Sequence, residues 1–320
     1  MTYEKFQKEL INRLQTKCAK GITLELTKQL KNNSQTKIGI LFRNPDTNAA
    51  PAIYLEEYYE QYQKDGNLEY IANDILQFYH SLPLISIDER SITDFNRIKN
   101  RITMKLINTE KNRALLDTVP HIPFEDLSIV YYCILKSTDD GLSTMLVKNQ
   151  HIAEWGVDTE ILHQYALANY KNLLSTKFLS MRQQMALLLH PCGNNSSHGD
   201  ECILPEYDSQ SNDFMYVLTN KMNHWGAALI TCKSLMDEIA DYFKEDFYIL
   251  PSSIHEVVLI PESKALSEEE FALMIQEINQ TKVEAQDYLS GHAYHYSRNG
   301  KNSIPCFGQN LSLASANCNF

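Results

Sequence analysis

Glycine is scarce in this chain, with 11 residues in 320, and the sequence has no glycine-rich phosphate-binding loop. It contains neither a Gly-x4-Gly-Lys-Ser/Thr loop nor a Gly-x-Gly-x-x-Gly turn, and it lacks the His-Glu-x-x-His and Gly-x-Ser-x-Gly motifs. Backbone that wraps closely around a phosphate usually needs glycine. These absences exclude the common nucleotide-binding, zinc-protease and serine-hydrolase signatures, and we expect no cofactor.

Long apolar runs are also missing. No stretch approaches the roughly 18–20 uncharged apolar residues of a membrane span. The first ten residues, MTYEKFQKEL, place charges where a signal peptide would be apolar. The seven cysteines are scattered and odd in number, which is typical of a reducing cytosol rather than a disulfide framework. We therefore expect a cytoplasmic protein that does not contact membranes.

Basic residues are outnumbered, and the formal net charge is −11. The imbalance is uneven: residues 1–120 carry 17 Lys and Arg against 15 Asp and Glu, whereas residues 121–320 carry 12 against 25. Acidic surfaces repel nucleic acid phosphates and anionic membranes. A nucleic-acid role would therefore need a local basic site, and we expect no binding to duplex nucleic acid.

The patterns that are present predict an α+β fold, with antiparallel hairpins packed with amphipathic helices in two subdomains. Apolar spacing and capping residues predict helices at residues 3–18, 56–64, 68–81, 149–155, 180–190 and 234–243, one capped by Asp158, and one beginning after the capping box of Ser267 and Glu270. Strand patterns fall at residues 21–26, 38–42, 52–55, 124–136, 142–147, 214–218, 227–232, 247–250, 256–260 and 293–296. Residues 90–113 fit a helix or a strand, and we favour a short helix followed by a strand.

The expected boundaries are an N-terminal α+β subdomain of residues 1–120 and an acidic α+β subdomain of residues 121–297. A polar segment at 191–213, rich in Asn, Ser and Gly, predicts a flexible excursion. Residues 298–320 are similar in composition and predict a mobile tail.

The segment from Pro251 to Pro261 is the most suggestive of chemistry. Ser253, His255 and Glu256 supply the residue types of a nucleophile, a base and an orienting acid. On a strand, however, adjacent side chains point to opposite faces and cannot form one dyad. We therefore expect a structural His255 in a core strand, neutral and hydrogen-bonded, and keep catalysis as the alternative.

Two further sets of residues are candidate sites. His190, Cys192, His198 and Cys202 are zinc-ligand types within thirteen residues, with His292 and His295 as a weaker pair, but the spacing lacks a Cys-x-x-Cys knuckle. We expect a metal-free loop there. Residues 90–113 carry a local charge of +5, and Arg97, Lys99 and Arg101 are predicted to be exposed and to form a site for an acidic protein partner. The alternative is a solvated face, or one that pairs with the protein's own acidic half.

Six segments of the chain form a distinctive set: Tyr54-Leu-Glu-Glu-Tyr-Tyr, Leu106-Ile-Asn-Thr-Glu-Lys-Asn, Val119-Pro-His-Ile-Pro-Phe, Trp155-Gly-Val, Tyr216-Val-Leu-Thr-Asn-Lys and Leu250-Pro-Ser-Ser-Ile-His-Glu-Val. Together they resemble a family of uncharacterised proteins common in anaerobic Gram-positive gut bacteria. The resemblance covers roughly residues 1–297, and a looser similarity to the YtpQ-like family runs through 145–173 and 250–261. It implies a bacterial cytosolic protein, an accessory of mobile elements among the options, and no catalytic residues.

The function predicted from the sequence is a non-enzymatic binding or regulatory protein that acts through protein contacts. The acidic surface, the 18 tyrosines and the missing catalytic signatures favour it. The alternative is a hydrolase-like enzyme with a site near His255. The sequence leaves the oligomeric state and the identity of the partner open.

Overall fold

A computed structural model describes residues 1–48, 50–82, 92–138, 141–189, 213–251 and 253–298 of the chain, and the structural statements below concern these residues. The chain divides into two compact units, Met1–Asp94 and Phe95–Phe320. The division does not follow the expected boundary after residue 120. It falls earlier because strand β4 (Ile102–Asn108) pairs along its whole length with β6 (Leu127–Thr138), which ties it to the second unit.

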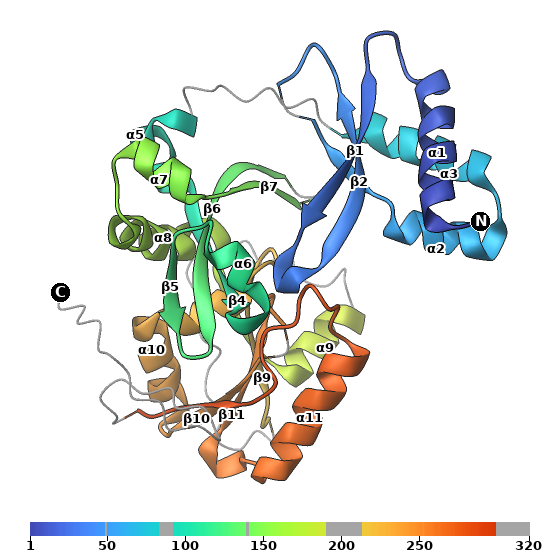
Figure 1. The fold of residues 1–320 in the computed structure, drawn as a ribbon. Coiled ribbons are helices and arrows are strands. Elements are labelled where there is room, and N and C mark those ends of the chain that lie inside the picture. Colours follow the sequence, from blue (N-terminus) through green and yellow to red (C-terminus); the bar gives the residue numbers. More distant parts are fainter. Residues whose placement is uncertain (49, 83–91, 139–140, 190–212, 252, 299–320) are drawn as a thin grey trace. The chain divides into compact units, whose positions relative to one another are not determined.

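Unit 1 is a small antiparallel sheet packed with helices (Figure 1). Its strand order is β1-β2-β3, and its elements are α1 (Tyr3–Lys17), β1 (Thr23–Leu30), a 3₁₀ turn (Asn32–Ser34), β2 (Thr36–Arg43), β3 (Ala52–Tyr54), α2 (Glu56–Asp65) and α3 (Leu68–Ser81). Apolar side chains at helical spacing on α1 and α3 pack on β2, and the core includes Phe6, Leu10, Leu14, Ile40, Phe42, Ile71 and Ile75. The expected hairpin and all three helices are present.

Unit 2 begins with a four-stranded antiparallel sheet. Strands β4 and β5 (His121–Phe124) flank β6, and β7 (Gly141–Leu146) pairs with the later half of β6. Its helices are α5 (Phe95–Ile98), α6 (Arg113–Leu116), α7 (Asn149–Trp155) and α8 (Thr159–Leu174), with 3₁₀ turns at Lys99–Arg101 and Glu110–Asn112. The short helix and the strand expected within residues 90–113 are thus α5 and β4.

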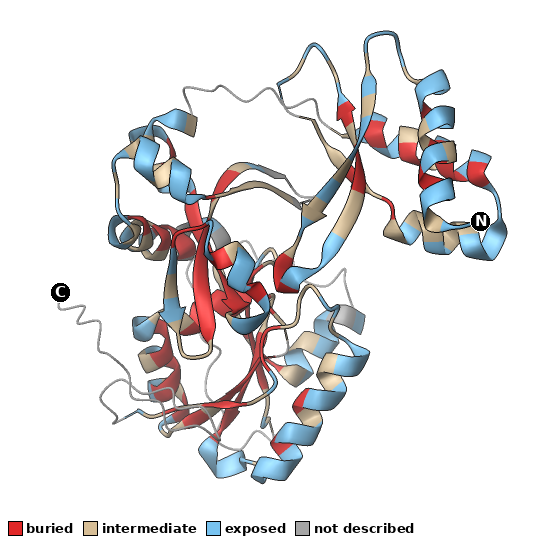
Figure 2. Ribbon diagram, in the orientation of Figure 1, coloured by how far each residue is buried: buried red, intermediate tan, exposed pale blue. Residues whose placement is uncertain are grey.

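The second sheet of unit 2 has five antiparallel strands in the order β12-β10-β11-β9-β8. The strands are β8 (Thr176–Ser180), β9 (Tyr216–Asn220), β10 (Phe247–Leu250), β11 (Val257–Pro261) and β12 (Tyr294–Tyr296), and the helices are α9 (Met181–Leu189), α10 (Lys233–Phe243) and α11 (Glu268–Thr281). Alternate residues along the strands point to opposite faces of the sheet. Residues on one face pack in a core cluster with α10, and residues on the other face pack in a cluster with α11. Helices α10 and α11 therefore cover opposite faces, and the central strands β9 and β11 are buried along their whole length (Figures 1 and 2).

Residues 227–232 do not form the predicted strand. Gly226–Thr231 is a 3₁₀ helix, with i to i+3 hydrogen bonds such as that from the Ala228 N–H to the Trp225 carbonyl. Every side chain from Ala227 to Ile230 is buried, so the segment has no periodicity by which sequence distinguishes a buried strand from a buried helical turn.

The mixture of helices and antiparallel sheets confirms the α+β class. None of the helices in the described ranges combines the length and the apolar character that crossing a bilayer requires. The excursion predicted at 191–213, apart from residue 213, and the tail predicted at 298–320, apart from residue 298, lie outside the described residues.

Candidate functional site

His255 lies in a bend just before β11, not in the strand itself. We expected the His255 side chain on a buried strand face, but it is 28% exposed and lies outside the strand. The backbone N–H of Trp225 donates a hydrogen bond of 3.3 Å to Nδ1, and Nε2 faces a carboxylate oxygen of Asp287 at 3.4 Å. Because Nδ1 accepts, the neutral ring carries its proton on Nε2, toward Asp287.

The other two candidate catalytic residues occupy the same bend. The hydroxyl oxygen of Ser253 accepts a hydrogen bond of 3.0 Å from the backbone N–H of His255, and the Ser253 N–H donates to the Glu256 carbonyl at 3.3 Å. These contacts form a local turn. The carboxylate that meets the His255 ring is Asp287, which lies 32 positions later in the chain and was missed by sequence reasoning.

The loop opposite His255 has a strained and closely packed backbone. Trp225 adopts a left-handed conformation, with φ 58°. A Cβ added to Gly226 would lie 2.5 Å from the His255 carbonyl oxygen and 2.5 Å from Oγ1 of Thr219. Only glycine therefore fits at position 226 without displacing the His255 backbone or the Thr219 side chain.

His224 is the most perturbed histidine of this region. Its ring centroid lies 5.2 Å from that of His255 and 4.3 Å from that of Trp225. Burial, followed by the charges of His255 and Lys105, lowers its pKa to about 4. The Lys105 ammonium lies 5.7 Å from the Trp225 ring centroid. His224 is therefore neutral at pH 7, and an imidazole of this kind is a weak proton acceptor.

A second histidine cluster brings His292 to Asp126. Nε2 of His292 lies 3.4 Å from a carboxylate oxygen of Asp126, and the Tyr294 hydroxyl donates to the same oxygen at 2.7 Å. Burial would raise the pKa of Asp126, but the hydrogen bonds from His292 and Tyr294 outweigh it and lower the pKa. Ser290 Oγ lies 3.4 Å from Nδ1 and 3.5 Å from Nε2 of His292.

This arrangement contains serine, histidine and aspartate, but it is not the geometry of a catalytic triad. An oxygen almost equidistant from both ring nitrogens lies off the in-plane axis along which either nitrogen donates or accepts a hydrogen bond. Ser290 is also fully buried, and no substrate reaches its hydroxyl. The cluster joins β12 to the turn between β5 and β6, which is a structural role.

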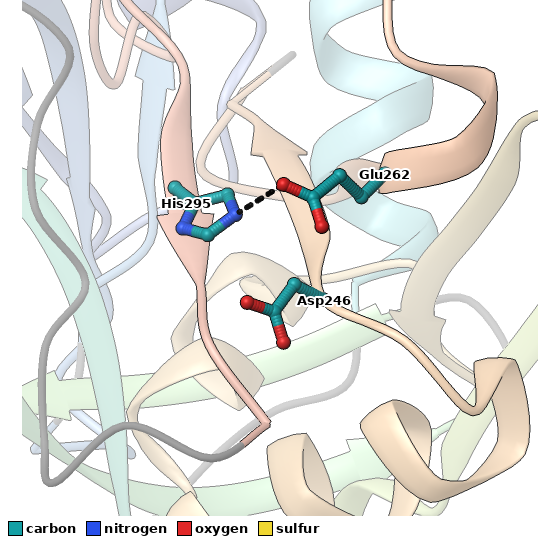
Figure 3. Close-up of side chains that lie close together, drawn as sticks. All are labelled: Asp246, Glu262 and His295. Carbon is teal, nitrogen blue, oxygen red and sulfur yellow. Dashed lines mark ion pairs between the residues drawn. The ribbon is translucent and has the colours of Figure 1, made fainter.

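A third cluster lies at one end of the five-stranded sheet and contains Asp246, Glu262 and His295 (Figure 3). One ligand atom from each residue lies within 4.8 Å of the other two. The structure thus separates His292 from His295, and only His295 lies in a set of metal-ligand type. The other zinc-ligand candidates, His190, Cys192, His198 and Cys202, lie outside the described residues.

The predicted basic residues lie together at one corner of unit 2, in α5 and in the 3₁₀ turn that follows it. Arg97 and Arg101 are exposed, and Lys99 is half-buried, with its ammonium 5.6 Å from the Tyr165 ring centroid. The Asn169 side chain of α8 donates hydrogen bonds to the carbonyls of Lys99 and Ile102, at 2.5 Å and 3.1 Å.

The same corner carries half-buried aromatic rings. The ring centroid of Phe95 lies 5.8 Å from that of Trp155 and 5.4 Å from that of Tyr165, which it meets edge to face. We call the set Phe95, Arg97, Lys99, Arg101, Trp155 and Tyr165 the basic–aromatic corner. Helices α5, α7 and α8, which carry most of it, lie side by side in Figure 1.

The two antiparallel sheets of unit 2, with polar clusters at strand ends, and the small sheet of unit 1 define a two-unit α+β protein. Residues 3–298 match the model of a family of unknown function, DUF5688, and the chain belongs to this family. Neither a curated protein nor a solved structure matches the chain. The expectation that the chain belongs to an uncharacterised family is confirmed.

Proposed function

We propose that this protein is a non-enzymatic binding protein that recognises an acidic protein segment through the basic–aromatic corner. The observation that carries the proposal is the combination of two exposed arginines, Arg97 and Arg101, with a cluster of packed aromatic rings. Guanidinium groups pair bidentately with carboxylates, and aromatic rings supply contact area at little cost in conformational entropy. A short acidic segment that also carries apolar side chains fits both features.

Charge distribution supports a protein segment over duplex DNA. The corner lies in a basic stretch of a chain whose net charge is −11. A long polyanion would be repelled by the rest of the surface, whereas a short acidic segment contacts only the local basic site.

Both ring nitrogens of His255 are in contact with other groups of the protein, which supports a binding role over a hydrolytic one. A general base needs a free nitrogen within reach of the proton that it removes. In His255 one nitrogen accepts from the Trp225 backbone and the other faces Asp287. The hydrolase-like alternative therefore has weaker support than the binding function.

The cytoplasmic location, an origin in gut bacteria, the similarity to the YtpQ-like family and an accessory role in mobile elements belong to the same proposal. The scattered cysteines and the quoted sequence segments support them.

The direct test measures binding of a fluorescent Glu-rich peptide containing aromatic residues, and of random-sequence DNA and RNA, over a salt series. Wild-type protein should bind the peptide at low ionic strength and weaken as salt rises. The Arg97→Ala/Lys99→Ala/Arg101→Ala variant should lose this binding. The matched control Lys8→Ala/Lys20→Ala/Lys28→Ala removes three positive charges from exposed positions of unit 1 and should retain it.

Micromolar binding to DNA or RNA that falls steeply with salt and vanishes in the Arg97/Lys99/Arg101 variant would make the protein a nucleic-acid binder instead. Equal peptide binding by the two triple variants would contradict the assignment of the corner. A pull-down from the native host, with wild-type protein and both variants compared by mass spectrometry, then identifies the partner.

A further inference from the structure

Strand pairing brings Asp246, Glu262 and His295 together from separate parts of the chain. Phe247 of β10 pairs with Pro261 of β11, so the residues just outside this pair, Asp246 and Glu262, lie opposite each other. The Glu262 N–H donates a hydrogen bond of 2.9 Å to the Asp246 carbonyl, which continues the ladder by one step. On the other side of β10, His295 of β12 pairs with Tyr248. Because Asp246 and Tyr248 are two residues apart, the three side chains share one face.

The distance between His295 and Glu262 is closer to that of two ligands on one metal ion than to that of a hydrogen bond. Nε2 of His295 lies 3.7 Å from Oε1 of Glu262, beyond hydrogen-bond range (Figure 3). Two ligand atoms on a tetrahedral zinc ion with bonds of about 2.1 Å are separated by about 3.4 Å. A small inward movement of the Glu262 side chain would therefore place both atoms on one cation.

The His295 nitrogen that faces the carboxylates has no hydrogen-bond partner although it is buried. A buried polar atom left without a partner is destabilising, and such atoms are uncommon in folded proteins. The atom is directed at two carboxylate groups, and a cation bound among the three side chains would satisfy it.

Contacts from neighbouring groups hold the ligand side chains in place. The His295 ring lies against Tyr248, with centroids 4.9 Å apart, and the backbone N–H of Arg298 donates a hydrogen bond of 2.8 Å to one oxygen of Asp246. The guanidinium of Arg298 pairs at 2.8 Å with Asp241, a carboxylate outside the cluster. Second contacts of this kind orient metal ligands in known sites.

We propose that Asp246, Glu262 and His295 form a binding site for a divalent first-row transition metal of the Zn²⁺ type. An imidazole nitrogen favours such metals over Ca²⁺ and Mg²⁺, which prefer all-oxygen sites. Glu262 is exposed, so water reaches the site and completes the coordination. The bound cation joins the edge strand β12 to β10 and β11.

The test is calorimetric titration of the metal-stripped full chain with Zn²⁺, and separately with Mg²⁺ and Ca²⁺. Zn²⁺ should bind with one-to-one stoichiometry, and the other two cations should not compete at equal concentration. Glu262→Gln and His295→Gln should each weaken Zn²⁺ binding by at least about 10–100-fold, which is the loss caused even by removing an outer partner of a metal ligand. The control Glu277→Gln, which removes an exposed carboxylate from α11, should bind as the wild type does.

The cysteine and histidine residues between 190 and 202 could also take up Zn²⁺, and two measurements separate the sites. In the Cys192→Ser/Cys202→Ser variant, binding should be retained. Co²⁺ titration should give ligand-field absorption without a thiolate-to-metal charge-transfer band. Binding that survives Glu262→Gln and disappears in the cysteine variant would overturn the proposal, as would no Zn²⁺ binding by wild-type protein. Circular dichroism confirms that each variant is folded.

Discussion

At His255, the contacts of the two ring nitrogens define what the side chain does. One nitrogen accepts a hydrogen bond from the backbone N–H of Trp225, in the loop that follows β9, and the other faces Asp287, which follows α11. The ring therefore joins three segments that are distant in sequence. Its position is supported by Gly226, where an added Cβ would collide with the His255 carbonyl.

His255→Ala should lower the free energy of unfolding by about 1–3 kcal/mol, because the Trp225 N–H loses its acceptor and Asp287 loses its partner. Urea denaturation measures the change. His121→Ala, at an exposed position on β5, is the control and should have little effect. A denaturation midpoint for His255→Ala equal to that of the wild type would argue against this role and favour the enzyme hypothesis.

His224 should make the stability depend on pH. Its pKa is lowered to about 4 in the folded protein, mainly by burial, whereas an unfolded histidine has a pKa of about 6.5. Between these values the unfolded chain binds a proton that the folded chain does not, so stability is full above about pH 6.5 and falls as the pH drops toward 4. Allowing for partial solvent access, the loss should be about 1–2 kcal/mol.

His224→Gln should remove this part of the pH dependence while leaving the contributions of other histidines. The comparison is chemical denaturation of wild-type and variant protein at pH 7 and pH 4.5. If both proteins lose the same stability between the two pH values, His224 is not the source.

At the scale of single elements, capping residues fix where α11 begins. The Ser267 hydroxyl accepts from the Glu270 N–H at 3.3 Å, and the Glu270 carboxylate accepts from the Ser267 N–H at 2.9 Å. This reciprocal pair is the capping box that the sequence predicted. The helix covers the sheet face that carries the proposed cation site, so its position matters for that site.

Ser267→Ala should destabilise the protein by about 1 kcal/mol, because the Glu270 N–H at the start of α11 loses its acceptor and the Glu270 carboxylate loses the hydroxyl that donates to it. Thermal unfolding detects the change. Thr281→Ala at the other end of the helix is the control, since its hydroxyl only donates back to the Glu277 carbonyl of the preceding turn. Equal effects of the two substitutions would show that the cap contributes nothing specific.

Sequence patterns predicted elements with a strong local signal and missed those without one. The amphipathic helices and the hairpins of unit 1 carry periodicity and turn residues. The 3₁₀ helix at Gly226–Thr231 is buried from Gly226 to Ile230, so its sequence fits a buried strand equally well, and β8 has no clear alternation of apolar and polar residues.

Only part of the candidate cation site could have been predicted from the sequence. His295 was noted as a weak ligand, but Asp246 and Glu262 were not. The β10–β11 hairpin alone would have placed these two carboxylates opposite each other. The position of His295 additionally required knowing that β12 pairs with β10 on its other edge, which is a tertiary contact.

At the scale of the whole molecule, unit 1 contains a core of its own. Every buried residue of that core cluster lies between Phe6 and Tyr79. A chain of this length can bury enough apolar surface to fold alone, although with limited stability.

Residues 1–94 expressed alone should therefore fold, because the segment keeps its complete sheet and all of its core. Circular dichroism should show mixed helix and strand, and heating should give one cooperative transition. Phe6→Ala in the same fragment should lower the midpoint sharply, since Phe6 is fully buried. A featureless, non-cooperative melt of the wild-type fragment would contradict the division of the chain at Asp94.

Each of the three sheets is built from one uninterrupted stretch of chain: residues 23–54, 102–146 and 176–296. During synthesis on the ribosome, the first sheet is complete long before the last strand has been translated. The second sheet differs, because Met104 and Tyr131 share a core cluster with Leu218 and Leu259 of the third. A nascent chain that has reached only Leu174 therefore displays apolar surface, and this stage of translation is where we expect chaperones to bind.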